Sequence, residues 1–234
     1  MLRLEGLSCG YGLFRAVSEL DLQVPRGSIT GLIGPNGAGK SSTLMCIAGH
    51  VDLQAGRIAF GEQDIGGLPA TERVRHGIAI APEGRRLFKD LSVEDNLRVG
   101  GLIHKASLFK ADRDYVLSLF PRLRERLAAL ASNLSGGEQQ MLSIGRALMA
   151  RPKLIMIDEL SLGLMPKMVD LCYDALLRLK QDGMTILLVE QNTDRVLSVA
   201  DRVCVLESGR TVWSGSAADA RKDPELAAAY LGLR

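Results

Sequence analysis

Residues Gly34 to Ser41 form a glycine-rich loop of a kind that binds phosphate groups. Their sequence, GPNGAGKS, fits the pattern GxxxxGK[ST] and lies between an apolar run and a segment with helical spacing. In such a loop backbone amides approach phosphate oxygens, the lysine reaches the β and γ phosphates, and the hydroxyl ligates magnesium. A glycine-rich turn without a ligand is the less favoured interpretation. The candidate nucleotide-binding residues here are Gly34, Pro35, Asn36, Gly37, Ala38, Gly39, Lys40, Ser41 and Ser42.

Two acidic residues follow a buried apolar run further along the chain. The run is Leu154 to Ile157, and Asp158 and Glu159 come directly after it. A carboxylate held beside the phosphate loop suits a magnesium shell, which is the role predicted for Asp158. Glu159 is then placed to act as a general base on an attacking water. An exposed strand end is the plainer interpretation of such a pair, and its combination with the phosphate loop favours the catalytic one.

A third motif, Ser135-Gly136-Gly137, precedes an amphipathic helix whose inner stripe contains Met141, Ile144 and Leu148. Ser135 is the expected N-cap, and by itself Ser-Gly-Gly is a common helix start. The positive end of the helix also exposes backbone amides and a hydroxyl, which together favour an anion. The chain therefore has a second candidate phosphate site.

The elements that position these motifs indicate a parallel sheet with ligand groups at one edge. Ser28 to Ile33 runs apolar into the glycine loop, and Ser42 to Gly49 has helical spacing. Leu154 to Ile157 and Thr185 to Val189 are apolar on both faces, as buried parallel strands are. The second of these runs ends in Glu190, so both end in carboxylates, at the edge where such sheets bind ligands.

Other segments indicate parts added to this sheet. Glu19 to Val24 alternates strictly and predicts a half-buried strand. From Ser92 to about Ser132 the pattern is helical and charged, and its last helix is expected to place Leu123, Leu127 and Leu130 on one stripe. Two further expectations concern the end of the chain: a hairpin over residues 203–213, and a short helix from Asp223-Pro224 to Gly232.

Composition narrows the classes of function. Among 234 residues, 29 Lys and Arg against 27 Asp and Glu leave a net charge of +2, and aromatic residues make up only 4%. A strongly basic face and stacking rings are therefore missing, so nucleic acid is not an expected partner. The first ten residues do not have the pattern of a signal peptide, and the four cysteines have no metal or redox spacing. We expect a cytoplasmic protein with reduced cysteines.

The motifs GPNGAGKSS, LSGGEQQ and LIMIDE occur in this order with a helical segment between them. This arrangement resembles the nucleotide-binding subunits of ATP-binding cassette (ABC) transporters over nearly the whole chain. The resemblance implies an α/β fold with a P-loop NTPase (RecA-like) core, a small antiparallel β subdomain and an inserted helical subdomain. It implies one ABC ATPase domain over 1–234, with 1–87 and 145–234 forming the β subdomain and core, and 88–144 the helical insert with the signature motif.

The same resemblance implies ATP and Mg²⁺ as ligands and a head-to-tail dimer with two sandwiched ATP molecules. The signature residues Ser135, Gly136 and Gly137 would complete the ATP site of the opposite subunit. Tyr11 stands where the family has an aromatic residue that stacks on adenine, although a lone tyrosine is equally compatible with packing.

Several positions depart from the usual family pattern. Glu83 replaces a glutamine and is counted with Ser41 and Asp158 among the metal-site residues, and Gln191 replaces a histidine that contacts the γ phosphate. In the loop after Glu159, Leu160 and Met165 replace a proline and an aspartate, so the subunit-communication loop is altered. The catalytic residues implied by the motifs are Glu159, Gln191 and Lys40.

The segments PEGRRLF, VEQN and SLGL are similar to one of the two ATPase subunits of importers for branched-chain amino acids, or of the similar urea and short-chain amide importers. The implied partners are a second ABC ATPase subunit in a heterodimer or homodimer, membrane permease subunits and, indirectly, a substrate-binding protein. The implied location is peripheral, on the cytoplasmic face of the inner membrane. Competing interpretations are a nucleotide-gated binding module with little turnover, a P-loop kinase, and a cassette ATPase of translation or DNA repair.

Overall fold

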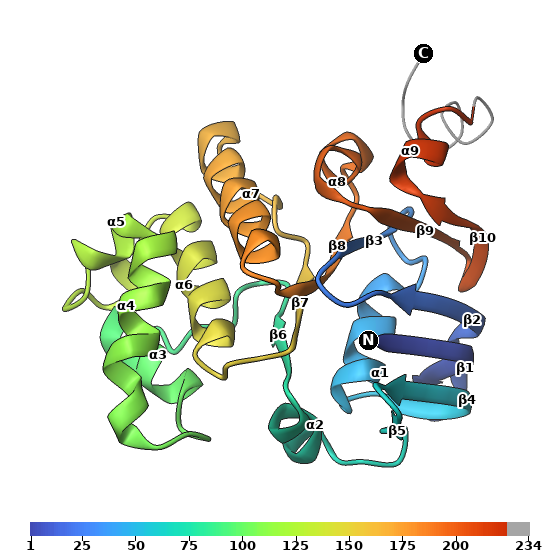
Figure 1. The fold of residues 1–234 in the computed structure, drawn as a ribbon, viewed down its shortest axis with the longest axis horizontal. Helices are drawn as coiled ribbons and strands as arrows, with labels where there is room; N and C mark the ends of the chain where they lie inside the picture. The colour runs from blue at the N-terminus through green and yellow to red at the C-terminus, as the bar shows by residue number, and fades with distance from the viewer. Residues whose placement is uncertain (224–234) are drawn as a thin grey trace.

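The computed structural model describes residues 1–223 and contains two β-sheets with helices around them (Figure 1). One sheet has four strands in the order β2-β1-β4-β5, and the other has six in the order β10-β9-β3-β8-β7-β6. The strands are β1 (Leu2–Tyr11), β2 (Phe14–Val24), β3 (Ile29–Ile33), β4 (Asp52–Phe60), β5 (Gln63–Asp64), β6 (Ile78–Ala81), β7 (Leu154–Asp158), β8 (Thr185–Glu190), β9 (Arg202–Glu207) and β10 (Arg210–Ser216).

Helices cover both faces of the larger sheet and also form a separate group at one end of the molecule (Figure 1). They are α1 (Lys40–Ala48), α2 (Ala70–His76), α3 (Val93–Gly100), α4 (Phe109–Leu119), α5 (Pro121–Arg124), α6 (Gly136–Leu148), α7 (Pro166–Gln181), α8 (Thr193–Val199) and α9 (Ala217–Ala220), with 3₁₀ turns η1 (Ala106–Leu108) and η2 (Ala131–Asn133). Among residues 1–223, no helix combines the length and the hydropathy needed to cross a bilayer.

The larger sheet is the parallel sheet that the apolar runs predicted. Strand β3 pairs in parallel with β8 and β9, and β7 pairs in parallel with β6 and β8. Every residue of β7 and β8 is buried, because helices cover one face and α1 with the small sheet covers the other. The carboxyl ends of β3, β7 and β8 therefore meet at one edge, where the glycine loop and the carboxylates follow.

The smaller sheet is antiparallel and holds α1 against the larger one (Figure 1). In β2 the predicted alternation is confirmed: Leu20, Leu22 and Val24 are buried, and they pair with residues of β1. One apolar cluster contains residues from both sheets and from α1, including Leu44 and Ile47. The start of α1 is fixed between the sheets as a result.

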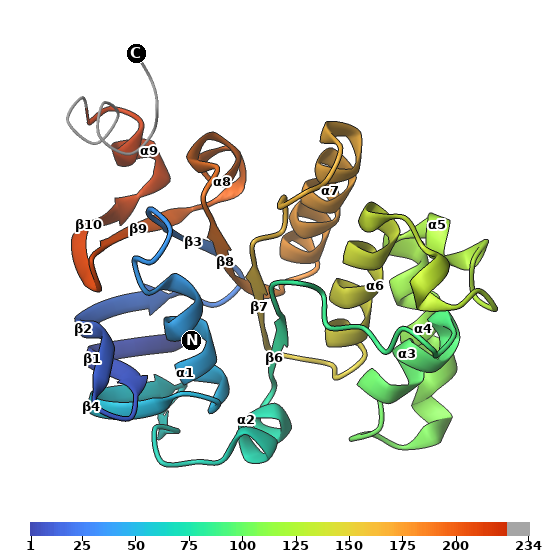
Figure 2. The same cartoon turned by 180° about the vertical axis from the view of Figure 1, so that it is seen from behind.

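The helical segment follows β6 and precedes β7, and it packs as a separate lobe at one end of the molecule (Figure 2). Helices α3 and α6 are in contact, and their buried residues are continuous with the cluster that covers the large sheet. The expected limit at residue 144 falls within α6, so that helix joins the lobe to the sheet.

The leucine stripe expected over residues 122–130 is wrong in its extent. Helix α5 ends at Arg124, and although Leu123 is buried, Leu130 is exposed. The following residues instead accept hydrogen bonds from the start of α3, with the amides of Val93 and Glu94 bound to the carbonyl oxygens of Ala129 and Leu127. This pairing satisfies amides that the first turn of a helix leaves free, and it outweighs the helical spacing of the leucines.

The predictions for the end of the chain are confirmed in part. Strands β9 and β10 form the expected hairpin around Ser208 and Gly209, both of which have positive φ angles. The four cysteines are buried and free, as expected. The helix expected from Asp223-Pro224 to Gly232 lies outside the described residues, apart from Asp223 itself.

Candidate active site

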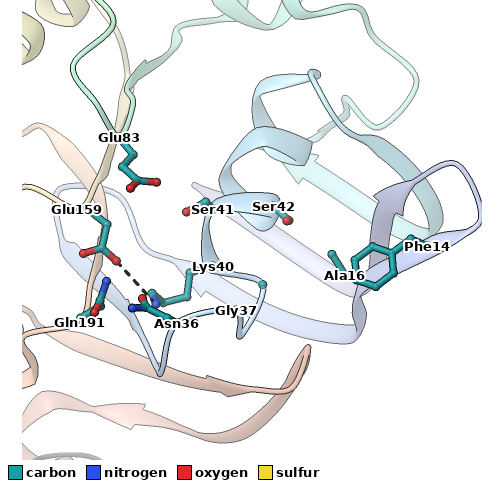
Figure 3. Close-up of a pocket in the computed structure, with 11 residues that line it drawn as sticks. Phe14, Ala16, Asn36, Gly37, Lys40, Ser41, Ser42, Glu83, Glu159 and Gln191 are labelled. Atoms are coloured by element: carbon teal, nitrogen blue, oxygen red, sulfur yellow. Dashed lines mark ion pairs between the residues drawn. The ribbon is translucent and has the colours of Figure 1, made fainter.

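A pocket of about 380 Å³ lies where the glycine loop meets the carboxyl ends of β7 and β8 (Figure 3). It brings together residues that are distant in the sequence, from the β2 strand, the glycine loop, α1 and the turns that follow β6, β7 and β8. Its lining consists of Phe14, Ala16, Asn36, Gly37, Gly39, Lys40, Ser41, Ser42, Glu83, Glu159 and Gln191.

The glycine loop requires glycine for its shape. Gly34 and Gly39 have φ angles of 149° and 101°, which residues with a Cβ rarely adopt. A Cβ at Gly34 would lie 2.0 Å from the Leu206 carbonyl oxygen, and one at Gly39 would lie 2.6 Å from a methyl carbon of Val17. The loop therefore passes closely between β9 and β2 before it opens into α1.

Lys40 is the first residue of α1, and its side chain is buried in the loop. Its Nζ donates to the carbonyl oxygens of Gly34 at 2.9 Å and Pro35 at 3.0 Å. The same atom lies 3.8 Å from Oε1 of Glu159, and both side chains are less than a tenth exposed (Figure 3). The buried ammonium is thus held between the phosphate loop and the carboxylate after β7.

Ser41 and Asp158 form a pair that suits a magnesium ion. The Ser41 hydroxyl donates to Oδ1 of Asp158 at 3.1 Å, and Oδ2 of Asp158 is buried without a hydrogen-bond partner. An unpaired buried carboxylate oxygen is costly, and a cation beside it would remove that cost. Residues 1–223 hold no cluster of three or more acidic, histidine or cysteine ligands, and magnesium commonly uses one or two protein ligands with phosphate oxygens and waters.

The pKa values of the carboxylates Asp158 and Glu159 at this edge are raised. Burial is the largest cause that raises the pKa of Asp158 to about 6, the charges of Glu159 and Glu83 add to it, and the Ser41 hydrogen bond and Lys40 oppose it. Burial likewise raises the pKa of Glu159, against a hydrogen bond from Gln191 and the charge of Lys40. A carboxylate with a raised pKa is a better general base near neutral pH.

Replacing Asp158 by asparagine is expected to stabilise the protein in the absence of Mg²⁺ and nucleotide, but only above the ordinary pKa of the carboxyl, 3.8. Below the ordinary pKa of 3.8 the side chain is protonated in both states, so its charge costs nothing. Between pH 3.8 and about 6 the unfolded carboxyl is ionised while the folded one keeps its proton, so the cost grows over this range and reaches roughly 3 kcal/mol above it. Chemical denaturation with EDTA at about pH 4 and about pH 8 measures this, and the variant should gain on its parent only at the higher pH.

A gain for Asp158→Asn that is equal at both pH values would contradict the burial of this charge. The matched control is Asp182→Asn, which alters an exposed carboxylate far from the pocket. That variant should show no gain at the higher pH.

Glu83 and its loop are attached to the helical lobe. The carboxylate of Glu83 faces Glu159 and Ser41 across the pocket (Figure 3). Two residues later, Arg85 donates to Oε1 of Gln139 in α6 at 3.2 Å, and its own carbonyl oxygen accepts from Ser143 and Arg146. Side chains of α6 therefore hold the backbone that follows Glu83.

The signature residues lie at the start of α6 and do not line the pocket. Ser135 caps this helix, and Glu138 completes a capping box with it, which confirms the predicted N-cap. At Gly136 a Cβ would lie 3.3 Å from the Arg85 guanidinium, and at Gly137 it would lie 2.4 Å from Met168 of α7. Close packing therefore accounts for Gly137 within this chain, and none of the three signature residues lines the pocket beside the chain's own glycine loop.

The adenine-stacking residue expected from the sequence does not line the pocket. Tyr11 and Phe14 pair across the β1–β2 hairpin, and the pocket includes Phe14 and Ala16 rather than Tyr11. Phe14 is 67% exposed and Tyr11 56%, so both rings are open to a ligand or partner. Phe14 was not among the site residues expected from the sequence, where its signal is that of an aromatic residue close to the Gly12 turn.

Comparison with known proteins agrees with this geometry. The chain belongs to the ABC transporter family, whose profile, described as "ABC transporter", matches residues 17–161. It is an ATP-binding subunit of this family, whose members hydrolyse ATP to power transport, and it is related to ATPases of branched-chain amino acid importers. The predicted family and the predicted P-loop NTPase fold are thereby confirmed.

Three relatives and one solved structure illustrate the similarity. The branched-chain amino acid transport ATP-binding protein BraG of Pseudomonas aeruginosa is 44% identical, covering 99% of this chain and 100% of that protein. BraF of the same organism is 30% identical, covering 99% and 98%, and a probable LivF of Archaeoglobus fulgidus is 37% identical, covering 93% and 92%. The ADP conformation of an ABC transporter cassette has a TM-score of 0.86 at 28% identity, covering 99% of this chain and 98% of that one.

Proposed function

We propose that this pocket binds ATP with Mg²⁺ and hydrolyses it to drive a membrane importer for branched-chain amino acids. The observation that carries the proposal is the convergence of Lys40, Ser41 and Glu159 on one pocket, with Asp158 hydrogen-bonded to Ser41. The glycine loop supplies amides for phosphate oxygens, and a fully buried strand fixes the two carboxylates, because Asp158 is its last residue and Glu159 follows directly.

Each residue has a distinct role in this proposal. Lys40 moves from the loop carbonyl oxygens to the β and γ phosphates of bound ATP, which replace the acceptors that it has here. Ser41 and Asp158 hold Mg²⁺, which when bound neutralises charge that develops on the phosphates. Glu159 accepts a proton from the attacking water, and Gln191 and Glu83 border the same space.

The remaining phosphate contacts come from a second ATPase subunit. Ser135, Gly136 and Gly137 start α6 outside this chain's pocket, which supports their action on nucleotide held by a partner. Because Gln191 cannot carry the charge of a protonated histidine, we propose that the two sites of the dimer are unequal. Pairing with a different ATPase subunit is favoured over a homodimer, since one organism has both a BraG and a BraF.

The subunit then works at the cytoplasmic face of the membrane, bound to permease subunits and indirectly to a substrate-binding protein. The names of the relatives support branched-chain amino acids as the cargo, and a urea or short-chain amide importer is the alternative. The bonds between α6 and the Arg85 backbone support a relay in which residues 88–144 move as a unit, with 1–87 and 145–234 as the nucleotide-binding body.

The competing candidate is a nucleotide-gated binding module, which the replacements at Glu83 and Gln191 favour. Steady-state phosphate release by the chain combined with its second ATPase and permease subunits separates the two. The proposal predicts Mg²⁺-dependent turnover that rises when the transported substrate is added. Tight ATP binding with no phosphate release in the assembled complex would favour the binding module instead.

A further inference from the structure

A carboxylate beside the pocket, that of Glu190, is fully buried and does not line the cavity. Glu190 is the last residue of β8, with 0% of its surface exposed. A buried carboxylate needs compensation, and within residues 1–223 Glu190 has no ion pair with a lysine or arginine. Hydrogen bonds compensate it instead: Ser161 donates from its amide to Oε1 at 2.7 Å and from its hydroxyl to Oε2 at 3.0 Å, and the Gln191 amide donates to Oε2 at 3.3 Å.

These bonds fix the turn that carries Glu159. The φ angle of Glu159 is 51°, a left-handed conformation that a side-chain-bearing residue rarely adopts unless its surroundings impose it. At one end of the turn, the Glu159 amide donates to the Val189 carbonyl oxygen at 2.9 Å. At the other end, both polar groups of Ser161 are bound to Glu190. Two successive residues of β8 therefore hold both ends of the turn.

We infer that Glu190 is a positioning residue of the ATPase site: through Ser161 and the Gln191 amide it sets the placement of Glu159 and Gln191 together. This inference rests on the function proposed above. A surface loop would satisfy Ser161 with water, whereas here a fully buried carboxylate accepts three hydrogen bonds from the two turns that border the pocket. Helix α7 covers the remaining side of Glu190 with the buried side chain of Tyr173, whose pKa is raised by burial, by the Glu190 charge and by hydrogen bonding to that carboxylate.

The test compares Glu190→Ala, Glu190→Gln and Ser161→Ala in the assembled complex. Loss of the bonds in Glu190→Ala is expected to lower kcat about 10- to 100-fold with KM for ATP changed less than about 3-fold, because the base is misplaced and the phosphate loop is untouched. In Glu190→Gln the side-chain oxygen accepts from the Ser161 amide and the side-chain nitrogen donates to the Ser161 hydroxyl, whereas the longer bond from the Gln191 amide is lost. Because both Ser161 bonds are kept, kcat should fall by no more than about 3-fold. Ser161→Ala keeps one of the two bonds and should lie between them.

A matched control lies at the other end of the same strand. Thr185 is buried and accepts from the Gly27 amide at 3.0 Å, so Thr185→Ala removes one buried hydrogen bond of β8 away from the pocket. This variant should lose stability without a fall in kcat. Amide hydrogen exchange over residues 159–163 adds a readout that needs no turnover, and it should accelerate in Glu190→Ala but not in Thr185→Ala.

The outcomes separate this inference from the proposed function. A parent complex that releases no phosphate overturns the proposed function. The hydrogen bonds of Glu190 would then have no catalytic role. An active parent with unchanged kcat and unchanged exchange in Glu190→Ala overturns the inference alone. A Glu190→Gln variant as impaired as Glu190→Ala would also overturn the inference, because the hydrogen bonds with Ser161, which this variant keeps, would then not be what positions Glu159.

Discussion

Glu159→Gln is expected to lower the rate of ATP hydrolysis by about 10²- to 10⁴-fold while ATP binding is kept. Glutamine preserves the size of the side chain and leaves Lys40 and the glycine loop in place, so the phosphate contacts survive. It removes the carboxylate that accepts a proton from water. In the parent, kcat should fall at acid pH with a midpoint above the ordinary glutamate pKa of 4.5, since burial raises the pKa of Glu159. Single-turnover phosphate release and equilibrium ATP binding measure the two effects separately.

The control for this variant is Glu72→Gln, which alters a partly exposed glutamate in the first turn of α2 that forms an ion pair with Arg75. It should hydrolyse ATP as the parent does. Hydrolysis by Glu159→Gln at the parental rate would show that another group accepts the proton, and the raised pKa would then reflect burial alone.

Lys40→Ala is expected to weaken ATP binding by about 10²-fold or more, because losing a buried, hydrogen-bonded charge costs about 2–5 kcal/mol. The substitution also removes the buried cation that pairs with Glu159, so the pKa of Glu159 should rise further. Hydrolysis should therefore fall for two reasons: ATP binds more weakly, and a larger fraction of Glu159 is protonated and cannot act as a base. Isothermal titration with ATP and Mg²⁺ measures the first effect, and phosphate release at saturating ATP measures the second.

Lys180→Ala is the matched lysine variant, since Lys180 pairs with Asp201 at 2.6 Å on the surface of α7. Its ATP affinity should equal that of the parent. An affinity for Lys40→Ala within about 3-fold of the parent would mean that backbone amides alone hold the phosphates.

The sequence predicts the nucleotide-binding core well because its signals are local and strong. Strands that are apolar on both faces admit only a covered parallel sheet, so β7 and β8 and the carboxylates after them follow directly from the residue pattern. The glycine loop is equally explicit, since its spacing specifies the lysine and the hydroxyl that start α1. In both cases one short segment carries the whole requirement.

Features that depend on distant partners were not predictable in the same way. The spacing of Leu123, Leu127 and Leu130 is helical, but helix α5 ends at Arg124. The carbonyl oxygens of the residues that follow it accept hydrogen bonds from the start of α3 instead. Tyr11 and Phe14 are paired on one hairpin, and only the packing of the two sheets decides which of them lines the pocket. Similarly, nothing adjacent to Glu190 reveals that Ser161, 29 residues away, is its hydrogen-bond partner.

The central claim is that ATP is held between the glycine loop of one ATPase subunit and the start of α6 from the other. A structure of the full complex with Mg²⁺ and a non-hydrolysable ATP analogue tests it most directly. We predict that the Ser135 hydroxyl and the Gly137 amide of this chain lie within about 3.5 Å of γ-phosphate oxygens of the nucleotide bound by the partner. Nucleotide in both glycine loops, with neither of these groups near any γ oxygen, would contradict the account.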